Sequence, residues 1–209
     1  MVGRIIKTEA DITEGVDWLA RAEPRFAEAV ELSGPIPLRK RKDGFEALLD
    51  AIVSQQLSVA AADTIWSRLE TGGWISADSI LVAHEDDLRA CGLSRPKIRY
   101  AQALAESGLD YEALRDMPNE EAIARLVEIK GIGVWTAEIY AMFSLGRADV
   151  FAPGDLALQE AARLLFDLPD RPAEKPFRAM AEAWSPWRAV AARVLWAYYR
   201  AAKKREGTR

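Results

Sequence analysis

Apolar residues recur at intervals of three and four along most of the chain, which is the spacing of helices with one buried face. This pattern predicts helices over residues 12–32 with a break at Pro24, and over 45–53, 58–69, 79–90, 96–106, 119–129, 134–143, 156–166, 176–184 and 187–202. Strand character is confined to residues 1–6 and 150–151, and no repeat with the period of a solenoid is present. We therefore expect an all-α protein.

Breaks in the pattern indicate how the helices are grouped. Glycine and proline in residues 34–37 end the first helical stretch, and the spacing of Asp43 and Glu46 predicts a capping box at the start of the next one. We expect two helical lobes. The first lobe spans 43–108, the second spans 109–209, and an N-terminal helical segment over 1–42 returns to the second lobe.

The composition restricts the chemistry that the chain can perform. Its 209 residues include a single cysteine, Cys91, and a single histidine, His84. One cysteine excludes an intramolecular disulfide and a four-cysteine zinc or iron–sulfur site, and one histidine excludes paired-histidine acid–base chemistry. Catalysis would therefore depend on carboxylates, hydroxyls, amides, lysine or arginine.

Charge and hydropathy give weaker indications. No apolar run approaches the roughly 20 residues of a membrane-spanning helix, so we expect a cytoplasmic protein with no membrane partner. The net charge of −4 argues mildly against nucleic acid, because counterion release rewards a basic surface. Basic residues do cluster at 39–42, 95–99 and 203–205, but each cluster alone is typical of a solvated loop or tail.

The most informative segment is Gly131-Ile132-Gly133, which lies between two predicted helices. Both glycines can adopt backbone angles closed to other residues, and Ile132 can anchor the turn in the core. The amides at the start of the second helix then suit a phosphate oxygen, which requires little side-chain charge. The alternative is a turn between antiparallel helices that binds no ligand.

A candidate catalytic group follows this turn. Asp155 comes after Pro153-Gly154 and directly before an apolar-periodic segment, so its position is that of a helix N-cap. A cap is held in one orientation, and a carboxylate so held can stabilise positive charge that develops on a sugar or can activate a water molecule. Capping alone is the competing interpretation.

These segments together resemble a known family. Residues 126–137 followed by 149–155 resemble the helix-hairpin-helix, Gly/Pro-rich loop and aspartate of the DNA glycosylase superfamily named for those features. Residues 54–58, 133–138 and 184–188, with Trp196, further resemble 3-methyladenine DNA glycosylase II. The resemblance implies a two-lobed helical DNA glycosylase fold. A full N-terminal sheet domain is not expected, because too few residues precede Asp43.

The resemblance also implies roles for individual residues. It makes Asp155 the catalytic carboxylate. It places four side chains in the pocket for the damaged base, namely Trp135, Trp196, Ile139 and Leu156, of which the last two replace aromatic residues. It assigns DNA contacts to two segments, namely Gly131, Ile132, Gly133, Val134 and Thr136 in the hairpin, and Gln55, Gln56, Leu57 and Ser58 in a loop that would fill the gap left by a flipped nucleotide. Either Gln56 or Leu57 would be the wedge, while a polar loop with Leu57 in the core is the alternative.

One departure from related enzymes bears on the reaction. Trp135 occupies the position where glycosylases that also cut the strand carry a Schiff-base lysine. The resemblance thus implies a monofunctional enzyme that hydrolyses the N-glycosidic bond of alkylated purines such as 3-methyladenine and 7-methylguanine in duplex DNA. A non-catalytic helix-hairpin-helix DNA-binding protein and a glycosylase for a non-alkylated damaged base remain the alternatives.

The resemblance implies no required cofactor and no iron–sulfur cluster. It does imply a structural Na⁺ or K⁺ at the hairpin, held by the backbone carbonyls of Val127, Ile129 and Ile132. The expected partner is duplex DNA containing damaged bases in the bacterial nucleoid, and the protein is expected to act as a monomer.

Overall fold

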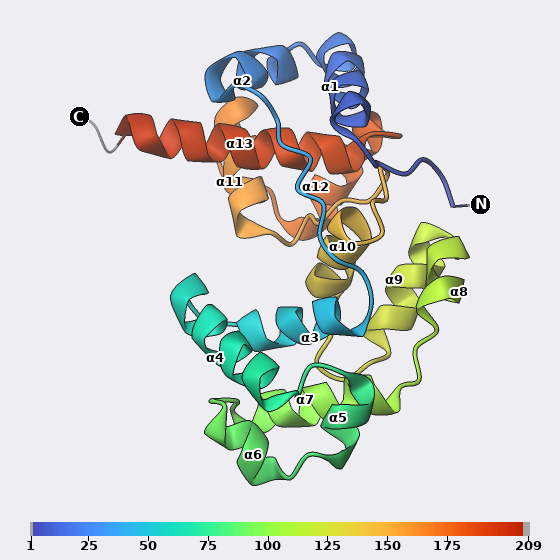
Figure 1. Ribbon diagram of the computed structural model, residues 1–209. Helices are drawn as coiled ribbons and strands as arrows, with labels where there is room; N and C mark the ends of the chain where they lie inside the picture. The colour runs from blue at the N-terminus through green and yellow to red at the C-terminus, as the bar shows by residue number, and fades with distance from the viewer. Residues whose placement is uncertain (1, 207–209) are drawn as a thin grey trace. The chain divides into compact units, whose positions relative to one another are not determined.

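The computed structural model describes residues 2–206, and side chains within residues 2–203. Over these residues the chain forms thirteen α-helices and one short 3-10 helix. Of the two segments with strand character, residues 150–151 form no strand, and the described part of residues 1–6 contributes only an isolated bridge between Ile5 and Arg147. The all-α prediction is therefore confirmed (Figure 1). None of the helices in this range has the length and hydropathy that crossing a membrane requires.

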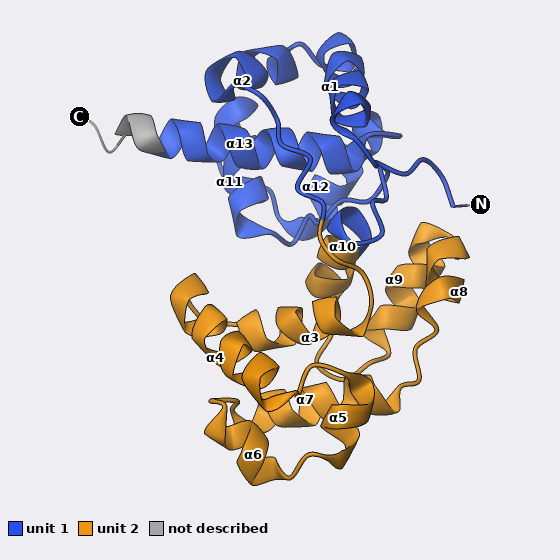
Figure 2. Cartoon of the chain, viewed as in Figure 1, with its two compact units in different colours: residues 1–40, 141–209 blue, residues 41–140 orange. Residues whose placement is uncertain are grey.

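The helices form two compact units, which are described separately. Unit 1 contains residues 1–40 and 141–209, and unit 2 contains residues 41–140 (Figure 2). The expected start of the second lobe at residue 109 is corrected, because residues 109–140 belong with unit 2. Asp43 at the beginning of unit 2 explains this grouping, since its carboxylate accepts hydrogen bonds from Arg115 and from the Tyr140 hydroxyl.

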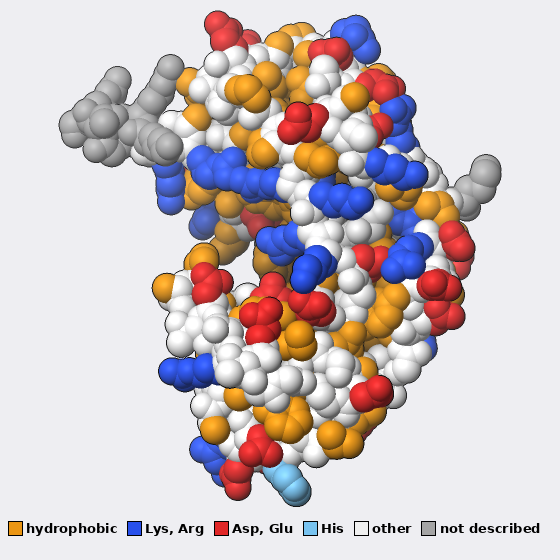
Figure 3. Space-filling view, viewed as in Figure 1, with side chains coloured by type: hydrophobic (Ala, Val, Ile, Leu, Met, Phe, Trp, Pro, Cys, Tyr) orange, Lys and Arg blue, Asp and Glu red, His pale blue; other side chains and the backbone are white. Residues whose placement is uncertain are grey.

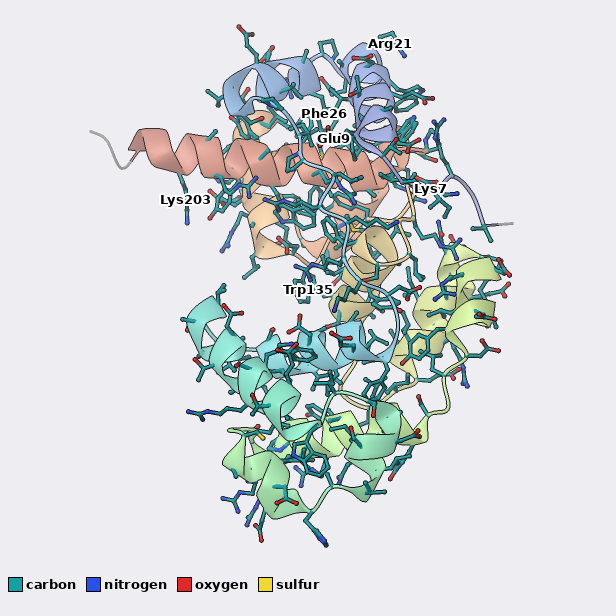
Figure 4. All side chains as sticks on the ribbon, viewed as in Figure 1. Lys7, Glu9, Arg21, Phe26, Trp135 and Lys203 are labelled. Atoms are coloured by element: carbon teal, nitrogen blue, oxygen red, sulfur yellow. The ribbon has the colours of Figure 1, made fainter. Side chains whose placement is uncertain are left out.

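Unit 1 is built around its C-terminal helix. Helix α13 (Arg188–Glu206) packs against α1 (Glu9–Ala22) and α2 (Arg25–Ser33) on one side and α11 (Leu156–Leu165) on the other (Figure 1). Helix α12 (Glu174–Ala181) and the 3-10 turn Glu182–Trp184 complete the unit. Its core contains an aromatic cluster of Phe26, Phe151, Phe166, Phe177 and Trp184. Figure 4 labels Phe26 within this unit.

Unit 2 is arranged around α7 (Arg95–Glu106), which packs against three other helices. They are α3 (Phe45–Ser54), α5 (Ala77–Val82) and α6 (Glu85–Ala90). Helix α4 (Val59–Gly72) packs on α3, and α8 (Tyr111–Asp116) and α9 (Asn119–Val127) lead to α10 (Val134–Phe143). The unit ends within α10, at Tyr140.

Two local predictions about unit 2 are corrected, and one helix was missed. The helix expected over 79–90 is two six-residue helices, because the backbone is extended at Ala83 and His84. Helix α8 was not predicted, although Asp110 caps it through the amides of Glu112 and Ala113. Asp43 is not the cap of α3, because Gly44 takes the N-cap position with no side-chain hydrogen bond.

Candidate functional site

The hairpin between α9 and α10 depends on one of its two glycines. Gly131 has a φ of +98°, and a Cβ added there would lie 2.3 Å from Cγ of Tyr100. Gly133 has no such backbone strain, and a Cβ added there would meet nothing within 4 Å. Of the two glycines that can adopt such angles, only Gly131 uses one, and it fits the turn, whereas Gly133 keeps the start of α10 open.

The residues after Gly131 divide into an anchor and an exposed surface. Ile132 is 3% exposed, which is the anchoring expected of it, while Val134 and Trp135 are 44% and 47% exposed. Figure 4 shows the Trp135 side chain leaving α10 near its start. Thr136 is buried, so any contribution it makes to binding comes through its backbone. Because the first-turn amides of a helix have no carbonyl partner four residues earlier, this end of α10 can accept an anion.

The loop between α3 and α4 is joined to this hairpin within unit 2. Gln55 donates from Nε2 to the carbonyl oxygen of Gly131 over 2.9 Å. Ser58 caps α4, with its hydroxyl accepting from the amide of Ala61. Gln56 is exposed at a φ of +57°, and Leu57 is 40% exposed, so the alternative that buried Leu57 in the core is wrong. Two exposed candidate wedge residues therefore sit on a loop that the hairpin fixes.

Lys97 binds the end of α3, directly before the same loop. The sequence gave no sign of this role beyond the basic cluster at 95–99. Its Nζ donates to the carbonyl of Val53 over 2.6 Å, near the end of α3. Burial lowers the pKa of Lys97, because the surroundings disfavour its charge. A cation at the end of a helix also interacts favourably with the exposed carbonyls there.

Asp155 caps α11 in unit 1, as its sequence position predicted. Its Oδ1 accepts hydrogen bonds from the amides of Ala157 at 2.9 Å and Leu158 at 3.0 Å. The indole Nε1 of Trp196 donates to the same oxygen over 3.2 Å. The sequence placed Trp196 in a base pocket but gave no sign of this bond. Three donors from two helices therefore fix one carboxylate oxygen.

Trp196 is itself packed in a short stack of side chains in unit 1. Its ring lies 5.7 Å from that of Phe143 at an interplanar angle of 35°, and the guanidinium of Arg193 lies 4.5 Å from the Phe143 ring centroid. Leu156, directly after Asp155, is 65% exposed. Trp196 and Leu156 thus belong to the same unit as Asp155, whereas Trp135 and Ile139 belong to unit 2.

The loop that leads to Asp155 is held at its start by a second carboxylate. Asp149 accepts from Nε of Arg188 at 2.6 Å and from the hydroxyl of Ser185 at 2.8 Å. Arg188 also donates to the Asp149 carbonyl over 3.1 Å. These bonds tie the motif at 184–188 to the motif at 149–155, which explains why the two occur together in the sequence.

Two kinds of metal site can be considered. In the described part of the chain, no three His, Cys, Asp or Glu side chains are grouped so that they could hold a metal ion. The carbonyl-only site expected at the hairpin is of another kind. The Ile129 carbonyl accepts from the amide of Ile132 over 3.0 Å, so this backbone oxygen takes part in the turn of the hairpin. Backbone oxygens are hard donors that suit an alkali cation.

Comparisons with known proteins agree with this geometry. Residues 49–188 match the HhH-GPD superfamily of base excision DNA repair proteins. DNA-3-methyladenine glycosylase 1 of Schizosaccharomyces pombe is 34% identical over 197 residues, which are 88% of this chain and 86% of the relative. The range that matches the superfamily, residues 49–188, contains the loop at 55–58, the hairpin and Asp155.

Two solved structures have a similar fold. A DNA-3-methyladenine glycosidase from Bacillus halodurans has a TM-score of 0.82 and 33% identity, with 91% of each chain covered. The 3-methyladenine DNA glycosylase of Schizosaccharomyces pombe, solved in complex with abasic DNA, has a TM-score of 0.74 and 32% identity, covering 88% of this chain and 95% of that one. The resemblance found in the sequence is confirmed.

Proposed function

The chain belongs to the HhH-GPD superfamily of base excision DNA repair proteins, and we propose that it is a monofunctional DNA glycosylase for alkylated purines. It hydrolyses the N-glycosidic bond of 3-methyladenine and 7-methylguanine in duplex DNA and leaves an abasic site. The observation that carries the proposal is the fixed Oδ1 of Asp155, which two backbone amides and the Trp196 indole hold in one orientation. The protein acts as a monomer.

The reaction follows from this carboxylate. When the bond between C1′ and the base breaks, its electron pair leaves with the alkylated purine, whose positive charge is thereby neutralised. The sugar becomes oxocarbenium-like, and the Asp155 carboxylate stabilises that charge. Water then adds to C1′ and loses a proton, which the same carboxylate can accept. A preoriented carboxylate favours this step, because no reorganisation is needed as the charge develops.

The hairpin and the α3–α4 loop bind the DNA in this proposal. The open start of α10 accepts a backbone phosphate through its amides, and the exposed Gln56 or Leu57 fills the gap in the base stack. An alkali cation at the hairpin would be held by the backbone carbonyls of Val127, Ile129 and Ile132, and the hardness of such oxygen donors supports this assignment. Such an ion would supply positive charge near a bound phosphate.

Two tryptophans account for the preference for alkylated bases and for the absence of strand cleavage. The faces of Trp135 and Trp196 attract a cationic purine, an interaction worth about 0.5–2 kcal/mol. Trp135 also takes the position of the Schiff-base lysine in bifunctional relatives, so this chain lacks the amine needed there. Borohydride should therefore trap no covalent complex between the protein and an abasic duplex.

A base-release assay on the Asp155→Asn variant tests the proposal. The amide retains the size of the side chain but removes its charge, so we expect loss of 3-methyladenine release of at least about 1000-fold with DNA binding retained. The exposed Asp170 of unit 1 provides the matched control, and Asp170→Asn should retain wild-type release. Equal rates for Asp155→Asn and wild type would exclude the mechanism.

The substrates compared should be duplexes containing 3-methyladenine, 7-methylguanine, 1-methyladenine and hypoxanthine. Release of hypoxanthine alone would show a glycosylase for a non-alkylated base. Tight binding without release of any base would instead show a non-catalytic DNA-binding protein. A borohydride-trapped complex would overturn the monofunctional assignment.

A further inference from the structure

An open groove lies beside Asp155 in unit 1 and is not used by the mechanism above. It has a volume of about 530 Å³ and begins at Leu156, the residue after the carboxylate. Helices α11 and α13 form its walls. The residues that line it are Leu156, Ala157, Glu160, Arg163, Leu164, Arg171, Tyr199 and Lys203.

Positive charge is in excess in this groove, although the whole chain carries a net charge of −4. Among the described residues that line it, the charged groups are three basic side chains and the carboxylate of Glu160. Arg163 donates twice to one oxygen of that carboxylate, at 2.7 and 3.0 Å, and Arg171 lies 3.7 Å from the other oxygen. One carboxylate thus orients two guanidinium groups without balancing the three cations.

Lys203 completes the basic lining from the opposite wall. Its Nζ lies 4.8 Å from the ring centroid of Tyr199, and the side chain leaves α13 on the side where α11 lies (Figure 4). The charges of Arg163, Arg171 and Lys203 all act on Glu160, whose pKa is lowered chiefly by the hydrogen bond from Arg163. In Figure 3, Lys and Arg side chains gather over the part of unit 1 where α13 runs.

We propose that this groove binds backbone phosphates of the DNA strand that carries the damaged nucleotide. Two observations favour this occupant: the groove starts one residue from the carboxylate assigned to the sugar, and its excess charge is opposite to that of DNA. The amides of Ala157 and Leu158 are engaged by Asp155, so the side chains provide the charge for the phosphate. The proposal rests on the proposed function. It makes the groove a second phosphate site, in addition to the one at the hairpin.

Salt dependence of DNA affinity tests this site. Binding of a fluorescent duplex with a stable abasic-site analogue is measured by anisotropy between about 50 and 200 mM salt, the range over which counterion release dominates. Arg171→Gln and Lys203→Gln should each lower the slope of log K against log salt by about 1 and weaken binding about five- to tenfold near 100 mM. Lys203→Arg, which retains the charge, should keep the wild-type slope.

Two further variants separate a phosphate site from a general loss of charge. Arg21→Gln removes an exposed cation from α1 of the same unit, away from the groove (Figure 4), and should leave the slope unchanged. Glu160→Gln removes the only carboxylate among the described residues that line the groove and should strengthen binding. Thermal melts of all variants confirm that they are folded.

The outcomes distinguish this inference from the function on which it rests. If wild-type protein releases alkylated bases but Arg171→Gln and Lys203→Gln retain its slope, the groove is not a phosphate site. The same conclusion follows if Arg21→Gln lowers the slope as much as they do. If wild-type protein neither binds the duplex nor releases a base, the proposed function itself fails.

Discussion

Oδ1 of Asp155 is held by donors of two different origins. The amides of Ala157 and Leu158 belong to the first turn of the helix that Asp155 caps, so local sequence alone provides them. The Trp196 indole comes from α13, 41 residues along the chain. In the proposed mechanism, Trp196 therefore acts as a positioning residue for the carboxylate through its N–H, in addition to the aromatic face that it would offer to a base.

Replacing Trp196 with phenylalanine separates these two roles. Phenylalanine keeps an aromatic face but has no donor for Asp155, and a hydrogen bond to a charged group is worth about 1.5–3 kcal/mol. We expect the rate of 3-methyladenine release in single turnover to fall about 10- to 100-fold, with a smaller change in DNA affinity. Trp196→Ala should lose affinity for the base as well. An unchanged rate in Trp196→Phe would show that the N–H does not position the carboxylate.

At the level of elements, the hairpin between α9 and α10 uses its glycines for different purposes. Gly131 permits the left-handed turn and the close approach of Tyr100, so it serves the fold. Gly133 has neither constraint, and its carbonyl accepts the first helical bond of α10 from the amide of Ala137. A side chain at Gly133 would project into the open space where the proposed function places a phosphate.

Two alanine variants form a matched pair that tests this division. Gly131→Ala should destabilise the protein by about 1–3 kcal/mol, because the methyl group meets Tyr100 and the backbone is strained. Gly133→Ala should leave the free energy of unfolding within about 0.5 kcal/mol of wild type but weaken duplex binding several-fold. Urea denaturation and fluorescence anisotropy measure the two effects. A destabilised Gly133→Ala with normal DNA affinity would contradict the assignment.

The sequence predicted the long elements better than the short ones. An apolar pattern sustained over nine or more residues is a strong signal, so α1, α2, α4, α7 and α10 lie close to their predicted ranges. Helices α5, α6 and α8 have six residues each, less than two turns, so their apolar periodicity is too short to separate or detect them. Their capping residues were the remaining signal.

The same distinction holds for the functional residues. Asp155 and the hairpin could be found from sequence because each is defined by residues next to it. The bonds from Trp196 to Asp155 and from Gln55 to Gly131 join residues 41 and 76 positions apart, and only the fold brings these pairs together. Asp43 shows how local reading fails, since a capping pattern was present but its carboxylate binds Arg115 and Tyr140 instead.

At the scale of the whole molecule, the chain leaves unit 1 after residue 40 and re-enters it at residue 141. The buried Arg193 of α13 contacts the chain next to both of these crossings between the units. Its guanidinium donates to the carbonyls of Leu38 at 3.2 Å, Met142 at 3.1 Å and Ala189 at 2.8 Å. It therefore connects the segment that exits the unit, the segment that returns and the central helix.

Substituting methionine at Arg193 tests this connection. Burial lowers the pKa of Arg193 to about 10, so the charge carries a desolvation cost that the substitution removes. The larger effect is the loss of donors for the part-buried carbonyl of Leu38 and the buried carbonyl of Met142, because an unsatisfied buried acceptor costs about 1–3 kcal/mol. We therefore expect the free energy of unfolding to fall by about 2–4 kcal/mol in urea denaturation.

The control lies on the same helix. Arg200 of α13 is exposed, so Arg200→Met makes the same chemical change without removing donors from buried carbonyls and should stay within about 0.5 kcal/mol of wild type. If Arg193→Met is as stable as Arg200→Met, the carbonyls of Leu38 and Met142 find other donors and the guanidinium does not hold the crossings. If only Arg193→Met is destabilised, one buried cation joins the segment that leaves unit 1 at Leu38 and the segment that returns at Met142 to the helix that also carries Trp196.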